Sequence, residues 1–228
     1  MKQKTPRHHR IHQEGRHSVF GIVVLMFLIN IPMYWFVQPH WVSAITLTLT
    51  AILLVFVAYF FRNPVREIEI TDPNFLLAPA DGHIVVIEPT MEDEVFHEKR
   101  LQVSIFMSPF NVHANWYPVE GDIIRSEHQK GRHMGAWLPK SSTENERSLV
   151  VIETPSKLQI AVRQIAGAMA RRIVTYAKVG KQSHRNEHMG FIKLGSRVDM
   201  YLPLNTEIFV EVGEAVRGNE TIIGRLPE

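Results

Sequence analysis

The stretch Gly190-Phe-Ile-Lys-Leu-Gly195-Ser196-Arg-Val-Asp-Met-Tyr-Leu-Pro203 places a Gly-Ser pair inside apolar, strand-like sequence. The run 196–202 is rich in β-forming residues and is followed by a proline, which is typical of a short strand. A Gly-Ser pair by itself indicates only a turn. The apolar flanks, close to the C-terminus, set this pair apart from an ordinary surface turn.

Short apolar runs of the same kind recur through residues 62–228, where Gly and Pro separate them. Besides 196–202, the predicted strands are 82–87, 101–107, 121–126, 148–153, 159–165, 172–178 and 207–212. Short helical turns are expected only at 93–99 and near 185–188. The pattern predicts a mainly β (α+β) fold, built as a compact antiparallel β domain.

The segment 212–224 resembles the turn-and-strand pattern of biotinyl and lipoyl carrier domains. Its glycines open tight turns between short strands. A carrier domain needs a modifiable lysine displayed on a hairpin, and no Met-Lys or Asp-Lys pair stands in such a setting. The segment therefore indicates barrel-sandwich-like architecture rather than carrier function.

The N-terminal part of the chain has a different composition. Residues 18–61 contain no Lys, Arg, Asp or Glu, and a membrane-spanning helix needs about 20 apolar residues. The length predicts two transmembrane helices, 18–37 and 41–61, with Gln38-Pro39-His40 as the turn between them. A signal peptide and a buried helical hairpin are the alternatives, but the run is long for a signal peptide and lacks a small-residue cleavage site.

Charge sets the expected orientation of this hairpin. Residues 1–17 form a basic tail, two arginines follow the second helix, and the connecting turn has no basic residue. Both ends are therefore expected on the cytoplasmic side of the cell (inner) membrane. The histidines of the tail fit a segment lying on anionic lipid better than a metal site. The net charge of +2 gives no support to nucleic-acid binding, and the absence of cysteine excludes disulfides and thiolate metal sites.

Three motifs follow one another along residues 78–203. They are Ala78-Pro-Ala-Asp81-Gly82, then Phe106-Met-Ser-Pro-Phe-Asn-Val-His113-Ala-Asn115, then the Leu-Gly195-Ser196-Arg-Val-Asp segment. Each is weak alone, because Asp-Gly is usually a turn and a lone histidine is usually structural. In this order, behind a membrane anchor, the sequence resembles the short form of the pyruvoyl-dependent phosphatidylserine decarboxylases.

The resemblance implies that the chain cleaves itself between Gly195 and Ser196. The Ser196 hydroxyl would attack the carbonyl carbon of Gly195, and a weak hydroxyl nucleophile needs a base within reach. His113 is the candidate base, since imidazole titrates near neutral pH. Asp81 would orient the imidazole and stabilise its cation. Gly195 allows a strained backbone because it has no Cβ.

The resemblance also implies what the cleavage produces. Ser196 becomes a covalent pyruvoyl cofactor that caps a small subunit, 196–228, while 1–195 is the large, membrane-bound subunit of a heterodimer. The family forms a Schiff base between this group and phosphatidylserine at the lipid bilayer, and releases phosphatidylethanolamine. No metal is expected.

One position departs from the wider family. Long-form members carry a second histidine three residues after the one that matches His113, and here that position is Trp116. A single histidine would then serve both reactions, or another would help; the candidates are His83, His133 and His188. Four basic residues could meet lipid phosphates or simply form a solvated face: Arg66, Arg171, Arg172 and Lys181.

Two other functions stay open at this point. A membrane-anchored barrel-sandwich module could serve as an adaptor without catalysis. An enzyme of the same kind could also act on another serine-headgroup lipid, such as an ether-linked archaetidylserine, because nothing in the sequence identifies the lipid tails.

Overall fold

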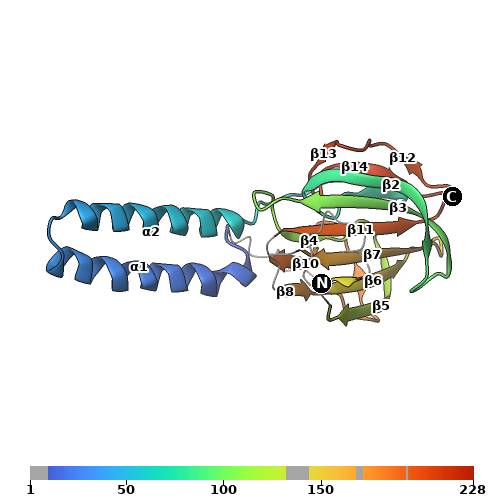
Figure 1. The fold of residues 1–228 in the computed structure, drawn as a ribbon. Coiled ribbons are helices and arrows are strands. Elements are labelled where there is room, and N and C mark those ends of the chain that lie inside the picture. The colour runs from blue at the N-terminus through green and yellow to red at the C-terminus, as the bar shows by residue number, and fades with distance from the viewer. Residues whose placement is uncertain (1–9, 132–143, 168–171, 194) are drawn as a thin grey trace, which may run out of the picture. The chain divides into compact units, whose positions relative to one another are not determined.

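The computed structural model describes residues 10–131, 144–167, 172–193 and 195–228. The chain divides into two compact units, Met1–Val65 and Arg66–Glu228. Figure 1 shows the first as a pair of helices and the second as layers of β-strands.

The first unit is a helical hairpin. A short 3-10 turn, η1 (Gln13–Gly15), leads into α1 (Arg16–Phe36), and α2 (Trp41–Phe60) runs back beside it. Both helices are long and apolar enough to cross a membrane. The two helices predicted from the sequence are therefore present, and the first begins two residues earlier than expected.

Polar side chains in the hairpin bond to each other or to the backbone. The Asn30 amide donates to the Thr50 hydroxyl at 2.9 Å and accepts from Thr46 at 3.1 Å. The Ser43 hydroxyl donates to the backbone carbonyl of Met33 at 2.8 Å. Such interhelical hydrogen bonds, together with close packing, hold helices together in lipid, where the hydrophobic effect between helices is absent.

The second unit contains an antiparallel sheet of eight strands, in the order β13-β2-β3-β11-β7-β6-β5-β9. Its strands are β2 (Gly82–Glu92), β3 (Glu98–Met107), β5 (Gly121–Gln129), β6 (Arg147–Glu153), β7 (Gln159–Ala166), β9 (Gln182–Ser183), β11 (Ser196–Leu202) and β13 (Ala215–Val216). Figure 1 shows this sheet curving from β2 to β5. The predicted mainly β (α+β) fold is confirmed.

Two smaller antiparallel sheets complete the unit. One has the order β4-β10-β8, and the other β1-β14-β12. Their strands are β4 (Ala114–Trp116), β8 (Arg172–Thr175), β10 (His188–Lys193), β1 (Phe75–Leu77), β12 (Glu207–Ile208) and β14 (Ile222–Arg225). The strand β4 begins directly after His113, and β10 ends two residues before Gly195.

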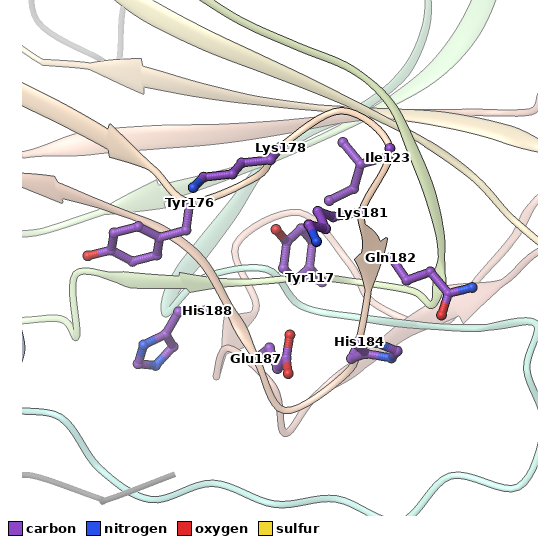
Figure 2. A pocket seen from close by; sticks show the side chains of 10 residues that line it. Tyr117, Ile123, Tyr176, Lys178, Lys181, Gln182, His184, Glu187 and His188 are labelled. Carbon is purple, nitrogen blue, oxygen red and sulfur yellow. The ribbon is translucent and has the colours of Figure 1, made fainter. Parts of the chain in front are cut away.

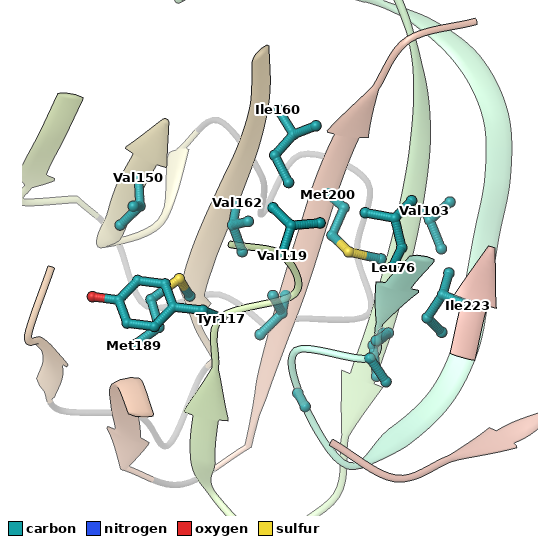
Figure 3. Packing of buried hydrophobic residues seen from close by; sticks show 14 of the residues in the cluster. Leu76, Val103, Tyr117, Val119, Val150, Ile160, Val162, Met189, Met200 and Ile223 are labelled. Atoms are coloured by element: carbon teal, nitrogen blue, oxygen red, sulfur yellow. The ribbon is translucent and has the colours of Figure 1, made fainter. Parts of the chain in front are cut away.

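The core lies on one face of the large sheet. Successive side chains of a strand point to opposite faces, so on β11 Val198, Met200 and Leu202 enter the core while Arg197 and Asp199 lie on the other face. Figure 3 shows Met200 packed among apolar side chains from neighbouring strands. The Asp199 carboxylate, fully buried, accepts from Arg197 Nε at 2.6 Å.

The helical turn predicted at 93–99 is instead the tip of the β2–β3 hairpin. Backbone N–H groups of Glu94, Val95 and Phe96 donate to the Glu92 carboxylate, which also meets Arg163 at 2.9 Å. Burial opposes ionisation of Glu92, yet these donors hold the pKa of its carboxyl below the ordinary value. The Glu92 carboxylate thus accepts hydrogen bonds from backbone N–H groups that, in a helix, would donate to backbone carbonyls.

Replacing Met200 by alanine tests whether β11 is a core strand. Met200 is fully buried, so Met200→Ala should lower the free energy of unfolding by about 2–5 kcal/mol. Leu204→Ala is the control, because Leu204 is 53% exposed and should change stability little. Urea denaturation in detergent, followed by pulse proteolysis, measures both, and equal losses would contradict the assignment.

Candidate active site

Ser196 is the first residue of β11 and is fully buried. It lies between Met107 of β3 and Ala166 of β7, its partners in the two flanking ladders. Its hydroxyl donates to the Met107 thioether at 3.2 Å. The alternation along β11 turns this side chain to the core face, so the predicted nucleophile lies inside the domain and away from bulk water.

Gly195 stands just before the strand with φ +52°. A Cβ built there meets nothing within 4 Å, so space does not demand glycine. The left-handed backbone does, because side chains other than glycine adopt it at a cost. The expectation that Gly195 permits an unusual backbone agrees with this conformation.

His113 precedes β4 and is fully buried. Its backbone carbonyl accepts from the Ile192 N–H at 3.2 Å, and its ring centroid lies 6.3 Å from that of Phe191. Ile192 and Phe191 belong to β10, the strand that leads to Gly195. The structure therefore ties the predicted base to the segment that carries the predicted cleavage bond.

Asp81 is held by an arginine and two backbone groups. Its carboxylate pairs with both terminal nitrogens of Arg66, accepts from the Gly218 N–H at 2.9 Å, and accepts weakly from the Val112 N–H at 3.4 Å. Val112 is the residue before His113, so the structure links Asp81 to this segment through the backbone. Its predicted contact with the imidazole stays a prediction.

The assignment of Arg66 to lipid phosphates is wrong. Its side chain is only 8% exposed and bonds to Asp81, and its Nε lies 3.2 Å from a Glu220 carboxylate oxygen. A guanidinium engaged in this way is not available to a membrane. Arg172 and Lys181 are exposed, and Arg171 lies outside the described residues.

Trp116 occupies the position of the second long-form histidine. The Arg66 guanidinium lies 5.1 Å from its ring, and the His188 ring lies edge-on to it at 5.1 Å. His188 therefore lies beside Trp116, the position of the second long-form histidine, but it belongs to β10. His83 is exposed on β2, and His133 lies outside the described residues.

A pocket of about 560 Å³ opens beside His188. Figure 2 shows the side chains around it, among them Tyr117, Lys178, Lys181 and Glu187. Burial and the nearby Glu187 carboxylate raise the pKa of the Tyr117 hydroxyl to about 12. The phenol therefore stays protonated at neutral pH and offers a hydrogen-bond donor.

Sequence reasoning did not assign two buried polar residues near Ser196. Asn115 was quoted within a motif without a role, and Gln164 lies in a predicted strand that is otherwise mostly apolar. Both are fully buried and are joined by a hydrogen bond of 2.7 Å. An inward-facing glutamine among Ile and Val at alternate positions was the signal that could have found this pair.

Comparison with known proteins identifies the family. A family model described as phosphatidylserine decarboxylase matches residues 53–224. Proteins named phosphatidylserine decarboxylase proenzyme are similar to the chain over nearly its whole length. The one from Bacteroides thetaiotaomicron is 53% identical, covering 95% of both chains, and the one from Porphyromonas gingivalis is 46% identical, covering 96% of this chain and all of the relative.

These matches define a self-processing lyase family. The chain belongs to the phosphatidylserine decarboxylase family. The alternative of an adaptor without catalysis is set aside, because the family model matches residues 53–224, which include the three motifs.

Removing the guanidinium beside Asp81 tests whether that ion pair supports the domain. Both side chains are nearly buried, so Arg66→Met should destabilise the domain by about 3 kcal/mol, because it leaves a buried carboxylate without its cation. Arg217→Met is the control, since Arg217 is 74% exposed and makes only a 3.5 Å contact with Glu220. Urea unfolding curves that shift equally for both variants would refute a structural role for Arg66.

Proposed function

We propose that this protein converts phosphatidylserine to phosphatidylethanolamine after cleaving its own chain between Gly195 and Ser196. The observation that carries the proposal is the position of Ser196, buried at the start of β11 directly after a glycine with φ +52°. Relatives with about half of their residues identical are named proenzymes of this decarboxylase, which supports both the substrate and the processing.

Cleavage begins with the hydroxyl of Ser196. Its oxygen forms a bond to the carbonyl carbon of Gly195, its proton passes to His113, and the carbonyl electron pair moves to oxygen. Collapse of this intermediate restores the carbonyl and breaks the peptide C–N bond, whose nitrogen takes up the proton. The product is an ester between Gly195 and the Ser196 side chain, with a free amine on residue 196.

The ester is then eliminated. Loss of the Cα proton of residue 196 breaks the Cβ–O bond and frees the Gly195 carboxylate, and water converts the resulting enamine to a pyruvoyl group and ammonia. The bound group supplies an electron sink for decarboxylation, while His113 returns a proton to the product.

Asp81 would act on His113 indirectly, through the backbone of Val112. Its carboxylate accepts from the N–H of Val112 and pairs with Arg66, so it fixes the backbone from which the imidazole projects. Positioning of this kind matters because a base must lie within hydrogen-bond reach of the proton that it removes.

The hairpin gives the reaction its location. A lipid with two acyl chains stays in the bilayer, so an enzyme that acts on its headgroup has to work at the surface. Two helices long enough to cross a membrane, flanked by basic residues at both ends, would hold the catalytic unit on the cytoplasmic side of the inner membrane.

Intact-mass measurement of the denatured full chain tests the cleavage. We expect two fragments, 1–195 and 196–228, the smaller with a blocked N-terminus, and Ser196→Ala should remain one chain that forms no phosphatidylethanolamine. His113→Ala should slow cleavage by about 10²–10⁴-fold. The control is His83→Ala, an exposed histidine on β2; active protein that stays uncleaved would refute the proposal.

The two fragments should remain associated after cleavage. Within 196–228, β11 pairs with β3 and β7, β13 pairs with β2, and β14 pairs with β1. An affinity tag at the C-terminus should therefore recover fragment 1–195 in mild detergent and lose it in concentrated urea. Recovery of the small fragment alone under native conditions would argue against a heterodimer.

A further inference from the structure

The core face of the large sheet becomes polar around Ser196. On β6 and β7, Val150 and Val162 point into the core, but Ser148 and Gln164, two residues along each strand, share that face. Both polar side chains are almost completely buried. Polar groups so placed must be hydrogen-bonded to offset their loss of water.

The hydrogen bonds of Gln164 fix which way its amide points. The hydroxyls of Ser148 and Thr175 donate to its Oε1 at 2.6 and 2.8 Å. Its Nε2 therefore faces the other way and donates to Asn115 Oδ1 at 2.7 Å. In this orientation the carbonyl oxygen accepts from both hydroxyls and the nitrogen has an acceptor, so each of the three contacts joins a donor to an acceptor.

The orientation of Gln164 sets that of Asn115. With Oδ1 of Asn115 occupied, its Nδ2 points to the Met107 thioether, 3.7 Å away. The same sulfur accepts the Ser196 hydroxyl at 3.2 Å. The amide donor of Asn115 and the nucleophile of the cleavage reaction are thus neighbours across one sulfur atom.

This sulfur is a poor partner for a buried amide. A thioether is a weak acceptor, and 3.7 Å is a long contact. Asn115 itself is fully buried. Holding a fully oriented donor against so weak an acceptor costs stability in the resting chain, and it leaves the donor ready for a stronger acceptor that forms nearby.

The backbone is adapted to this amide pair. A Cβ on Gly190 would lie 2.7 Å from Gln164 Nε2 and 2.3 Å from the Val174 carbonyl oxygen. Glycine at this position lets β10 pack directly on the Gln164 amide, and β10 pairs with β4, which carries Asn115. The chain that leads to Gly195 is therefore packed against the amides that orient the donor.

We infer that Asn115 is a catalytic residue of the self-cleavage, whose Nδ2–H stabilises the oxyanion that forms on Gly195, and that Gln164 is its positioning residue. The inference rests on the proposed cleavage at Gly195–Ser196. When Ser196 Oγ bonds to the Gly195 carbonyl carbon, negative charge develops on the carbonyl oxygen. We propose that the Nδ2–H of Asn115, which already points toward the region around Ser196, donates to this oxygen. The charge returns to the carbonyl as the C–N bond breaks, so Asn115 gains and loses no proton.

The test follows cleavage of the full chain from its synthesis in a cell-free system with lipid nanodiscs. Asn115→Ala should slow the appearance of 196–228 by on the order of 10²-fold, as loss of one oxyanion donor does. Gln164→Glu should slow it similarly, because a carboxylate would accept from Asn115 Nδ2 and turn its oxygen toward Ser196. Both variants should keep a trypsin-resistant domain.

Two matched controls separate this role from packing. Gln102→Glu places a carboxylate on the opposite face of the same sheet, where Gln102 donates to Ser104 at 2.8 Å, and should cleave at nearly the normal rate. Thr175→Val removes one of the two donors to Gln164 and leaves Ser148, so cleavage should fall only a few-fold. Should Asn115→Ala lose its trypsin-resistant domain, Gln164→Glu, which preserves size, decides the question.

Hydroxylamine identifies the step that is affected. It cleaves the ester intermediate at Gly195 but not the peptide, so Asn115→Ala should stay intact in its presence if the variant is blocked before ester formation. Accumulation of a hydroxylamine-sensitive ester, or cleavage at the normal rate, would overturn the role of Asn115. Failure of the unmodified chain to cleave would instead remove the proposed function itself.

Discussion

The position of Ser196 depends on the two antiparallel ladders that β11 forms with β3 and β7. Their register sets Ser196 opposite Met107 and Ala166. Because side chains alternate between faces, a slip of one residue would turn Ser196 out of the core and bring Arg197 into it. The apolar residues of β11 prevent such a slip, so the same hydrophobic burial that stabilises the domain also fixes the position of Ser196.

Polar chemistry inside this core is possible because buried polar groups near Asp81 and Ser196 have partners of fixed direction. Asp81 is paired with Arg66, and Gln164 is fixed by two hydroxyl donors. The Met107 sulfur is the exception, since it accepts from both Ser196 and Asn115 only weakly. The weakest hydrogen bonds of the network therefore lie where the proposed reaction would create new charge.

The sequence was sufficient for the longer strands and for the helical hairpin, because alternation and length are local signals. It failed for β4, which has only three residues and is defined by its pairing with β10. Arg66 was misassigned for a related reason: its partner Asp81 is fifteen residues away, and a basic residue after a membrane helix normally meets lipid. Asn115 and Gln164 come together only through the tertiary fold, so no spacing in the sequence could pair them.

The location of the proposed cleavage bond reconciles a cut chain with an intact fold. Gly195 lies outside β11, and the ladders begin at Ser196. Breaking the bond between them leaves the pairs from Arg197 to Leu202 intact, because these pairs of β11 lie on the C-terminal side of the cut. A bond one or two residues further along would sit within two ladders at once, and its rearrangement would have to disrupt the centre of the sheet. At the N-terminal end of a central strand, a nucleophile can therefore be held rigidly while the peptide bond before it stays free to react.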